Sequence, residues 1–253
     1  MQYIDILGYK VRYHEEGDGN NLLLIHGLGG SLDSFKHNKE LSKDLHIIAL
    51  DLLGFGYSDK PRIRYSISMF TRLIHAFLDK LSIDNTSILG SSLGGQIAAE
   101  FAIRYPKLVD KLVLVSPAGI TPYSFRGSKD LHLYASIFDA KDKEDLKKRL
   151  MSDDEEYIDY MYDYIKMDNA KYAFYSALEH SSKAPRLYDR LDRIKSLTMV
   201  IWGKEDSIIP VRYCKPFIDM KNCRLILLEG VGHRAHYEKP RLFNRLVLDF
   251  INE

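Results

Sequence analysis

The chain has 253 residues, of which 45% are hydrophobic and 28% are charged, a composition that excludes a wholly disordered chain and is typical of a globular protein. Its 36 Lys and Arg residues nearly balance its 35 Asp and Glu residues, so no overall field favours nucleic acid or an anionic membrane as a partner. Its apolar runs are far shorter than the roughly 18 residues that span a bilayer, and no basic-then-apolar leader is visible, so we expect a cytoplasmic protein.

Short β-rich runs alternate with amphipathic runs along most of the chain. This alternation favours one α/β domain, built on a mainly parallel sheet with helices on both faces. The expected strands, in chain order, are 3–7 and 10–14, which form a hairpin, and then 22–25, 46–50, 87–89, 111–115, 198–202 and 224–228. Helical spacing of apolar residues is clearest at 70–81 and 242–250.

The alternation stops between residues 117 and 197, where no strand-like run occurs. Apolar residues at helical spacing mark this stretch, namely Leu146, Leu150, Ile158, Met161 and Ile165. We therefore expect a helical cap at 117–197, inserted into a core formed by 1–116 and 198–253. Residues 139–168 hold eleven acidic and six basic side chains, which we interpret as solvated helix faces.

The sequence Gly90-Ser91-Ser92-Leu93-Gly94 joins a short apolar strand to a helix of small residues. A nucleophile elbow needs this context, because its sharp turn leaves no room for side chains two positions before and after the nucleophile. Gly90 and Gly94 satisfy this condition around Ser92, whereas leucines flank Ser91. The alternative is that Ser92 only caps the helix that follows it.

A serine hydroxyl needs a base to remove its proton, and an acid to hold that base in one tautomer. Asp206 follows the expected strand 198–202, and His233 follows the strand 224–228 in a loop that contains two glycines. The chain order Ser, Asp, His matches three successive strand ends of one such sheet. We predict Asp206 as the acid, with Glu205 as its rival, and His233 as the base, with His236 as its rival.

An oxyanion must be met by hydrogen-bond donors that are already in place. We assign the backbone N–H of Leu93, at the start of the helix, as one donor. The second is expected from the loop His26-Gly27-Leu28-Gly29-Gly30, where we assign Leu28 and keep Gly29 as the neighbour it could be confused with. We expect the His26 ring to hold this loop by hydrogen bonds rather than to act in catalysis.

These motifs resemble those of the α/β-hydrolase fold superfamily. The resemblance covers nearly the whole chain and rests on segments 26–30, 51–58, 90–95 and 202–206, with Gly232-His233 followed by Glu238-Lys239-Pro240. It implies an eight-stranded, mostly parallel sheet, a cap inserted after the sixth strand, and hydrolysis through an acyl-enzyme with no metal or organic cofactor. The two cysteines, Cys214 and Cys223, cannot form a Cys-x-x-Cys metal site.

The resemblance also separates activities within the superfamily. Epoxide hydrolases and haloalkane dehalogenases carry Asp at the elbow, where this chain has Ser92. Carbon–carbon bond hydrolases of ring-cleavage products usually have Asn before the serine and Gly-Pro in the oxyanion loop, where this chain has Ser91 and Gly29-Gly30. They remain an alternative, as do thioesterases and cofactor-free perhydrolases with the same triad.

We therefore expect a serine carboxylesterase for small-molecule esters with a small or medium acyl chain, and we leave a homodimer open. Aromatic residues of the cap either line an apolar pocket or pack the cap onto the core: Tyr123, Phe125, Tyr134, Phe138, Tyr172, Phe174 and Tyr175. An alternative of another class, suggested by the uneven cap charge, is a ligand receptor that keeps the fold and turns over slowly or not at all.

Overall fold

The computed structural model describes residues 2–120, 136–150 and 152–253 of the chain. Eight strands form one sheet in the order β1-β2-β4-β3-β5-β6-β7-β8. The strands are β1 (Gln2–Ile6), β2 (Tyr9–Glu16), β3 (Asn20–Ile25), β4 (Leu45–Leu50), β5 (Thr86–Ser91), β6 (Val109–Val115), β7 (Leu197–Gly203) and β8 (Cys223–Leu228). Only the pairs β1/β2 and β2/β4 are antiparallel, which confirms the expected eight-stranded, mostly parallel sheet.

Each expected strand is present, with ends that differ by at most two residues from the expected ones. The central strands β3, β5 and β6 are buried on both faces, which is why their sequences read as continuous apolar runs rather than alternating ones. Along β3, Leu22 and Leu24 point to one core and Leu23 and Ile25 to the other, as the two-residue period of a strand requires.

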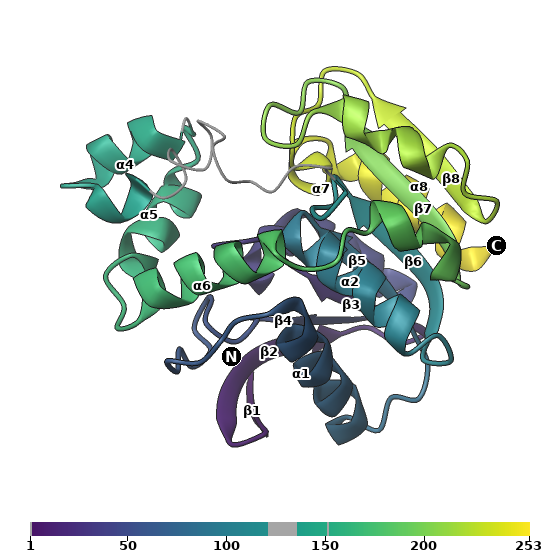
Figure 1. Ribbon diagram of the computed structural model, residues 1–253, viewed down its shortest axis with the longest axis horizontal. Coiled ribbons are helices and arrows are strands. Elements are labelled where there is room, and N and C mark those ends of the chain that lie inside the picture. Colours follow the sequence, from purple (N-terminus) through teal and green to yellow (C-terminus); the bar gives the residue numbers. More distant parts are fainter. Residues whose placement is uncertain (1, 121–135, 151) are drawn as a thin grey trace.

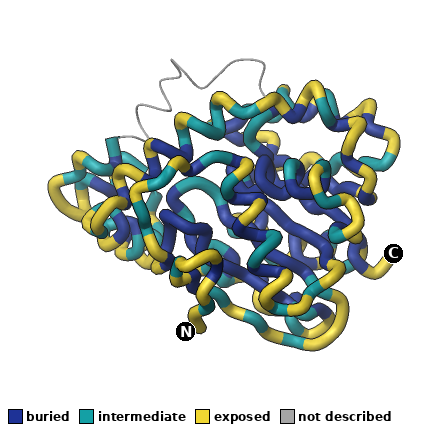
Figure 2. The backbone as a smooth tube through the Cα atoms, turned by 60° about the horizontal axis from the view of Figure 1, so that its bottom comes forward, coloured by how far each residue is buried: buried dark blue, intermediate teal, exposed yellow. Residues whose placement is uncertain are grey.

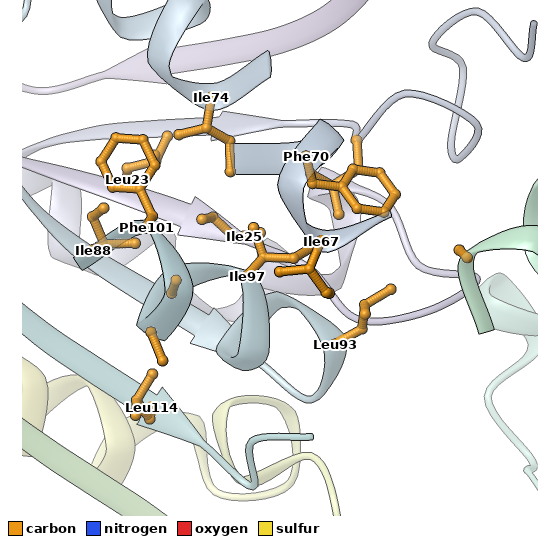
Figure 3. Packing of buried hydrophobic residues seen from close by; sticks show 14 of the residues in the cluster. Leu23, Ile25, Ile67, Phe70, Ile74, Ile88, Leu93, Ile97, Phe101 and Leu114 are labelled. Carbon is orange, nitrogen blue, oxygen red and sulfur yellow. The ribbon is translucent and has the colours of Figure 1, made fainter. Parts of the chain in front are cut away.

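Helices cover both faces of the sheet (Figure 1). Helices α1 (Ile67–Lys80) and α2 (Leu93–Arg104) pack on the face of Leu23 and Ile25, and Figure 3 shows Ile74, Ile97 and Phe101 in this core. Helix α8 (Pro240–Asn252) and the 3-10 segment η1 (Leu32–Lys43) cover the opposite face through residues such as Phe243 and Leu41. The short helix α7 (Ala235–Glu238) precedes α8. The expected helices 70–81 and 242–250 are thus present as α1 and α8.

Segment η1 is an element that the apolar spacing does not predict. It begins with a capping box, in which the Ser31 hydroxyl accepts from the Asp33 N–H and the Ser34 hydroxyl accepts from the Ser31 N–H. Its apolar contribution is small, with Phe35 and Leu41 as the buried hydrophobic side chains. Two shorter 3-10 segments, η3 (Tyr188–Arg193) and η4 (Val211–Phe217), are also absent from the prediction.

Between β6 and β7, the described residues form helices and the turns and loops that connect them, with no strand. It contains η2 (Ser136–Asp139), α4 (Lys143–Leu150), α5 (Glu155–Tyr164), α6 (Ala170–Ser182) and η3. We call residues 136–193 the cap; Figure 1 shows α4 and α5 extending beyond the sheet, joined to it by the long α6. Of the five apolar positions that predicted these helices, Leu146, Ile158 and Met161 are fully buried. The boundaries 117 and 197 stay a prediction.

The sheet lies at the centre of the molecule, where most residues are buried, and exposed residues surround it (Figure 2). Among the residues described, no helix combines the length and the apolar composition needed to cross a bilayer.

Candidate active site

The carboxyl ends of β5, β7 and β8 lie at the same edge of the sheet, because these strands are parallel. Ser91 at the end of β5 pairs with Val115 of β6, and Val115 pairs with Ile201 of β7. Gly203 of β7 in turn pairs with Leu228 of β8. The topology therefore brings the segments that carry Ser92, Asp206 and His233 to one edge, although 141 positions separate the first and the last along the chain.

Ser92 stands in a sharp turn between β5 and α2, with φ 55° and ψ −116°. A Cβ atom on Gly90 would lie 2.3 Å from the Gly94 carbonyl oxygen, and one on Gly94 would lie 2.1 Å from the Ile25 carbonyl oxygen. Only glycine fits at either position, which is the packing reason for the elbow motif. A non-glycine residue at positive φ is strained, and such strain gathers at functional sites.

The hydroxyl of Ser92 makes no capping hydrogen bond to α2. The interpretation of Ser92 as a simple helix cap therefore does not describe this turn. Its Oγ instead lies beside the loop that follows β3, since a Cβ on Gly27 would be 3.8 Å from Oγ. Ser91 is buried in β5, so the elbow presents Ser92 and not its neighbour.

His233 and Asp206 are joined by a hydrogen bond of 2.8 Å between Nδ1 and Oδ2. The Asp206 side chain is fully buried, and its other oxygen accepts from the backbone N–H groups of Ile208 and Ile209 at 2.9 and 2.8 Å. These bonds fix the carboxylate, so it can hold the imidazole in one orientation. Across the described residues, no hydrogen bond joins the His233 ring to the Ser92 hydroxyl.

Glu205 does not occupy the position of Asp206 beside the His233 ring, and His236 does not occupy the position of His233. The Glu205 carboxylate accepts from the Val231 N–H at 2.9 Å and so braces the loop before His233. Backbone hydrogen bonds lower the pKa of this carboxyl group. The His236 ring is buried between Phe35 and Phe243, and burial lowers its pKa to about 3. His236 is therefore a neutral core residue near neutral pH.

Glu238 is a residue of this site whose role the sequence analysis did not assign. Its two carboxylate oxygens accept from the backbone N–H groups on either side of His233, at 2.6 Å from Gly232 and 2.9 Å from Arg234. Glu238 thus holds the backbone of the residue that carries the imidazole. The Glu-Lys-Pro that follows Gly232-His233 marked Glu238 in the sequence. Its contacts with the backbone beside His233 could not be predicted, because they depend on the position of α7 next to this loop.

The loop His26–Gly30 lies next to the elbow and is held by the His26 ring, as expected. His26 Nε2 accepts from the Leu52 N–H at 3.0 Å, so Nδ1 carries the proton and donates to the Gly27 carbonyl oxygen at 2.7 Å. Burial lowers the pKa of this imidazole and keeps it neutral. Within the described chain, the Leu28 N–H has no hydrogen-bond acceptor.

The Leu93 N–H belongs to the first turn of α2, where backbone donors lack partners within the helix. The elbow and the 26–30 loop are adjacent, since a Cβ on Gly27 would lie 3.2 Å from the Cβ of Ser92. The assignment of the Leu93 N–H to the oxyanion stays a prediction. Whether Leu28 or Gly29 supplies the second donor stays a prediction.

The cap covers this loop. A Cβ on Gly29 would lie 3.1 Å from the ring of Phe174 and 3.8 Å from Met161, so cap side chains pack directly on its backbone. The Tyr160 phenol donates to the carbonyl oxygen of Gly30 at 2.8 Å, a contact that the sequence analysis missed. Burial raises the pKa of this phenol well above its ordinary value, so it stays a donor.

The aromatic residues predicted for the cap divide into three groups. Tyr123, Phe125 and Tyr134 lie outside the described residues. Phe138 and Phe174 pack against each other with ring centroids 5.3 Å apart, and Phe174 also lies against Gly29. Tyr172 and Tyr175 are partly exposed, at 36% and 37%. Phe174 and Phe138 therefore behave as packing residues.

In the part of the chain that the structure describes, no group of three or more His, Cys, Asp or Glu side chains lies close enough together to hold a metal ion. Cys214 is buried and Cys223 is half-buried, and both are free thiols. Burial raises the pKa of Cys223 to about 11.

Comparison with known proteins gives a consistent picture. Residues 20–157 match the family described as the alpha/beta hydrolase fold. The chain is 27% identical to 2-hydroxy-6-oxo-6-(2'-aminophenyl)hexa-2,4-dienoic acid hydrolase of Metapseudomonas resinovorans, over 99% of this chain and 90% of that protein. It is 29% identical to 2-hydroxymuconate semialdehyde hydrolase of Pseudomonas sp. (strain CF600), over 97% and 92% of the two chains.

Among solved structures, the meta-cleavage product hydrolase of Pseudomonas fluorescens IP01 is similar, with a TM-score of 0.87 and 26% identity. That match covers 100% of this chain and 97% of the other. The fold, the order of the motifs and the family match agree over more than half of the sequence. The chain therefore belongs to the alpha/beta hydrolase fold family.

Proposed function

We propose that the protein is a serine-dependent hydrolase that cleaves carboxylic esters through an acyl-enzyme on Ser92. The observation that carries the proposal is the 2.8 Å bond between His233 and the buried Asp206, at the sheet edge where the strained Ser92 also stands. A carboxylate on Nδ1 leaves Nε2 free to accept a proton, as a general base requires. The alpha/beta hydrolase fold family to which the chain belongs supports the coarser part of the proposal, that the protein is a hydrolase.

In the proposed reaction, Ser92 Oγ attacks the carbonyl carbon of the ester while His233 Nε2 takes the hydroxyl proton. The oxygen of the tetrahedral intermediate receives hydrogen bonds from the N–H groups of Leu28 and Leu93. His233 then gives its proton to the leaving alcohol, and the acyl group remains on Ser92. A water molecule, deprotonated by His233, attacks this acyl group and releases the acid. Asp206 holds the imidazole through both half-reactions.

Two variants test the acid assignment against its rival. Asp206→Asn should lower kcat by about 10⁴, because an amide at this position favours the wrong tautomer of His233. Glu205→Gln is the matched control, and it should retain kcat within about tenfold, because it alters only the bracing of Val231. Assays with p-nitrophenyl esters of graded chain length give both values. A larger loss for Glu205→Gln than for Asp206→Asn would contradict the assignment.

A carbon–carbon bond hydrolase of ring-cleavage products is a second candidate, and the comparisons favour it specifically. The two relatives named above are, by name, a hexa-2,4-dienoic acid hydrolase and a 2-hydroxymuconate semialdehyde hydrolase. The similar solved structure is, by name, a meta-cleavage product hydrolase. The same serine, histidine and oxyanion donors would serve a substrate in which a carbon leaving group replaces the alcohol. Ser91 and Gly29-Gly30 are the positions where this chain departs from the pattern expected of such enzymes.

Comparison of kcat/KM for the two substrate classes separates the two candidate functions. Purified protein is assayed with p-nitrophenyl esters and, by loss of dienol absorbance, with 2-hydroxy-6-oxohexa-2,4-dienoates. A kcat/KM at least a hundredfold higher for the esters supports the esterase, and the opposite ratio identifies a carbon–carbon bond hydrolase. Multiple rapid turnovers on either class would remove the receptor alternative. The absence of turnover on both classes would contradict both candidates.

A further inference from the structure

A concave, positively charged surface lies between the outer side of α2, the start of α1 and the end of the cap. Its volume is about 650 Å³. We call it the basic groove and define it by its charged lining residues, which are Arg64, Glu100, Arg104, Lys183, Arg190 and Arg193. Ser66, Ser68, Gln96 and His180 add polar groups to the same lining. Nothing in the proposed ester chemistry uses these residues.

The charge of the groove is strongly unbalanced. Five of its lining residues are Lys or Arg and one is Glu, which leaves a formal charge of +4, while the whole chain carries only +1. Glu100 is already engaged, since it accepts from Arg190 at 2.6 Å and lies 3.5 Å from Arg104. The single carboxylate therefore contacts two guanidinium groups and offsets one of the five positive charges.

Two of the cations are available to a ligand. Arg64 and Arg193 are exposed, and among the residues that the structure describes neither is joined to a carboxylate. Lys183 pairs with Glu179, outside the lining. A guanidinium group presents two parallel donors that match the oxygens of phosphate and carboxylate groups, so exposed arginines facing one cavity favour a ligand with several such groups.

The groove joins the core to the cap. Its walls come from α1 and α2 on one side and from the chain after α6 on the other, and Figure 1 shows α6 crossing next to α1 and α2. The Arg190–Glu100 pair and the bond from Gln96 Nε2 to the Ser181 carbonyl oxygen connect the two sides. A bound ligand would therefore contact both parts of the molecule at once.

We propose that the basic groove binds a small ligand with several adjacent anionic oxygens, of the polyphosphate or polycarboxylate class. Its volume falls in the range of pockets for small molecules, which is about 300–1,000 Å³. A polymer is a poorer fit, because a nucleic acid needs a longer track of positive charge than one groove on a nearly neutral chain provides. The proposal does not depend on the reaction at Ser92.

Calorimetric titration of the intact protein with tripolyphosphate, and separately with citrate, tests this proposal. We expect one saturable site for at least one probe, with an affinity that falls as salt is raised. Tighter binding of tripolyphosphate identifies a phosphate ligand, and tighter binding of citrate a carboxylate ligand. The same probe should raise the melting temperature in proportion to its occupancy.

Two double variants, one in the groove and one on the opposite face of the sheet, test which charges bind the ligand. Arg64→Gln with Arg193→Gln should weaken binding by roughly tenfold or more, because each removes a charge-assisted donor from the groove. Arg241→Gln with Arg245→Gln changes the net charge equally on exposed positions of α8, on the opposite face of the sheet, and should leave binding within about twofold. No saturable binding of either probe, or equal weakening by both double variants, would overturn the proposal.

Discussion

The phenol of Tyr160, in cap helix α5, donates a hydrogen bond of 2.8 Å to the carbonyl oxygen of Gly30. This contact ties the cap to the loop whose Leu28 N–H we assign to the oxyanion. The donor is fixed because burial keeps the phenol protonated. The cap thus helps to hold the loop in the position that catalysis would need.

Tyr160→Phe should lower kcat by about three- to tenfold, because the loop loses one restraint on its backbone while the ring still fills its space. The free energy of unfolding should fall by only about 1 kcal/mol. Tyr157→Phe is the matched control, one turn earlier on the same helix, whose ring packs against Arg234. Steady-state kinetics and urea unfolding measure both effects. Equal losses of kcat in the two variants would show that the Gly30 contact has no special role.

Glu238 is predicted to act through His233 rather than on the substrate. Glu238→Ala should lower kcat by roughly tenfold to a hundredfold with little change in KM, because the two N–H groups that flank His233 lose their acceptor. Glu238→Gln retains one acceptor oxygen and should recover part of kcat.

The control for Glu238 is Glu229→Gln, which removes an exposed charge that pairs with Lys204 near the same loop. It should leave kcat within about twofold. A change confined to the free energy of unfolding in Glu238→Ala, with kcat unaltered, would contradict a positioning role.

His236 makes the fold sensitive to acid. Its folded-state pKa of about 3 lies below the ordinary value of 6.5, because burial disfavours the charged ring. As the pH falls from 6.5 towards 3, the unfolded chain binds a proton that the folded chain does not, so stability is lost over this window. Between pH 7.5 and 4.5 the loss from this residue should be on the order of 3 kcal/mol.

His236→Phe keeps an aromatic ring between Phe35 and Phe243 and removes the titration. Its urea-unfolding free energy should therefore fall less steeply between pH 7.5 and 4.5 than that of the parent protein. His14→Gln, which replaces an exposed histidine, is the matched control. Parallel pH dependences in the parent and His236→Phe would show that His236 protonates freely in the folded state.

Much of the fold could be predicted because its determinants are local in sequence. Buried strands such as β3 and β6 read as apolar runs, and the elbow reads as two glycines around a serine because no other residue fits there. Asp206 and His233 could be predicted as site residues because each follows the end of an expected strand, and parallel strands bring their carboxyl ends together. Segment η1 was missed because its buried side chains are few and its start depends on hydrogen bonds of Ser31 and Ser34.

The missed parts of the site are contacts between distant segments. Tyr160 meets Gly30 across 130 positions, and no periodicity in either segment encodes that meeting. Glu238 lies six positions beyond Gly232, but its side chain reaches the loop only because α7 begins immediately after Arg234. The cationic side chains of the basic groove likewise come from three separate parts of the chain. In the sequence, each of them is indistinguishable from an ordinary solvent-exposed charge.

Covalent labelling of the nucleophile tests the central claim most directly. The protein is treated with a fluorophosphonate and the adduct is located by peptide mass spectrometry, beside steady-state ester hydrolysis by the parent and Ser92→Ala. We predict one adduct, on Ser92, and a fall in turnover of roughly three to six powers of ten in the variant. A label on another residue, or a Ser92→Ala protein that hydrolyses esters as fast as the parent, would contradict the account.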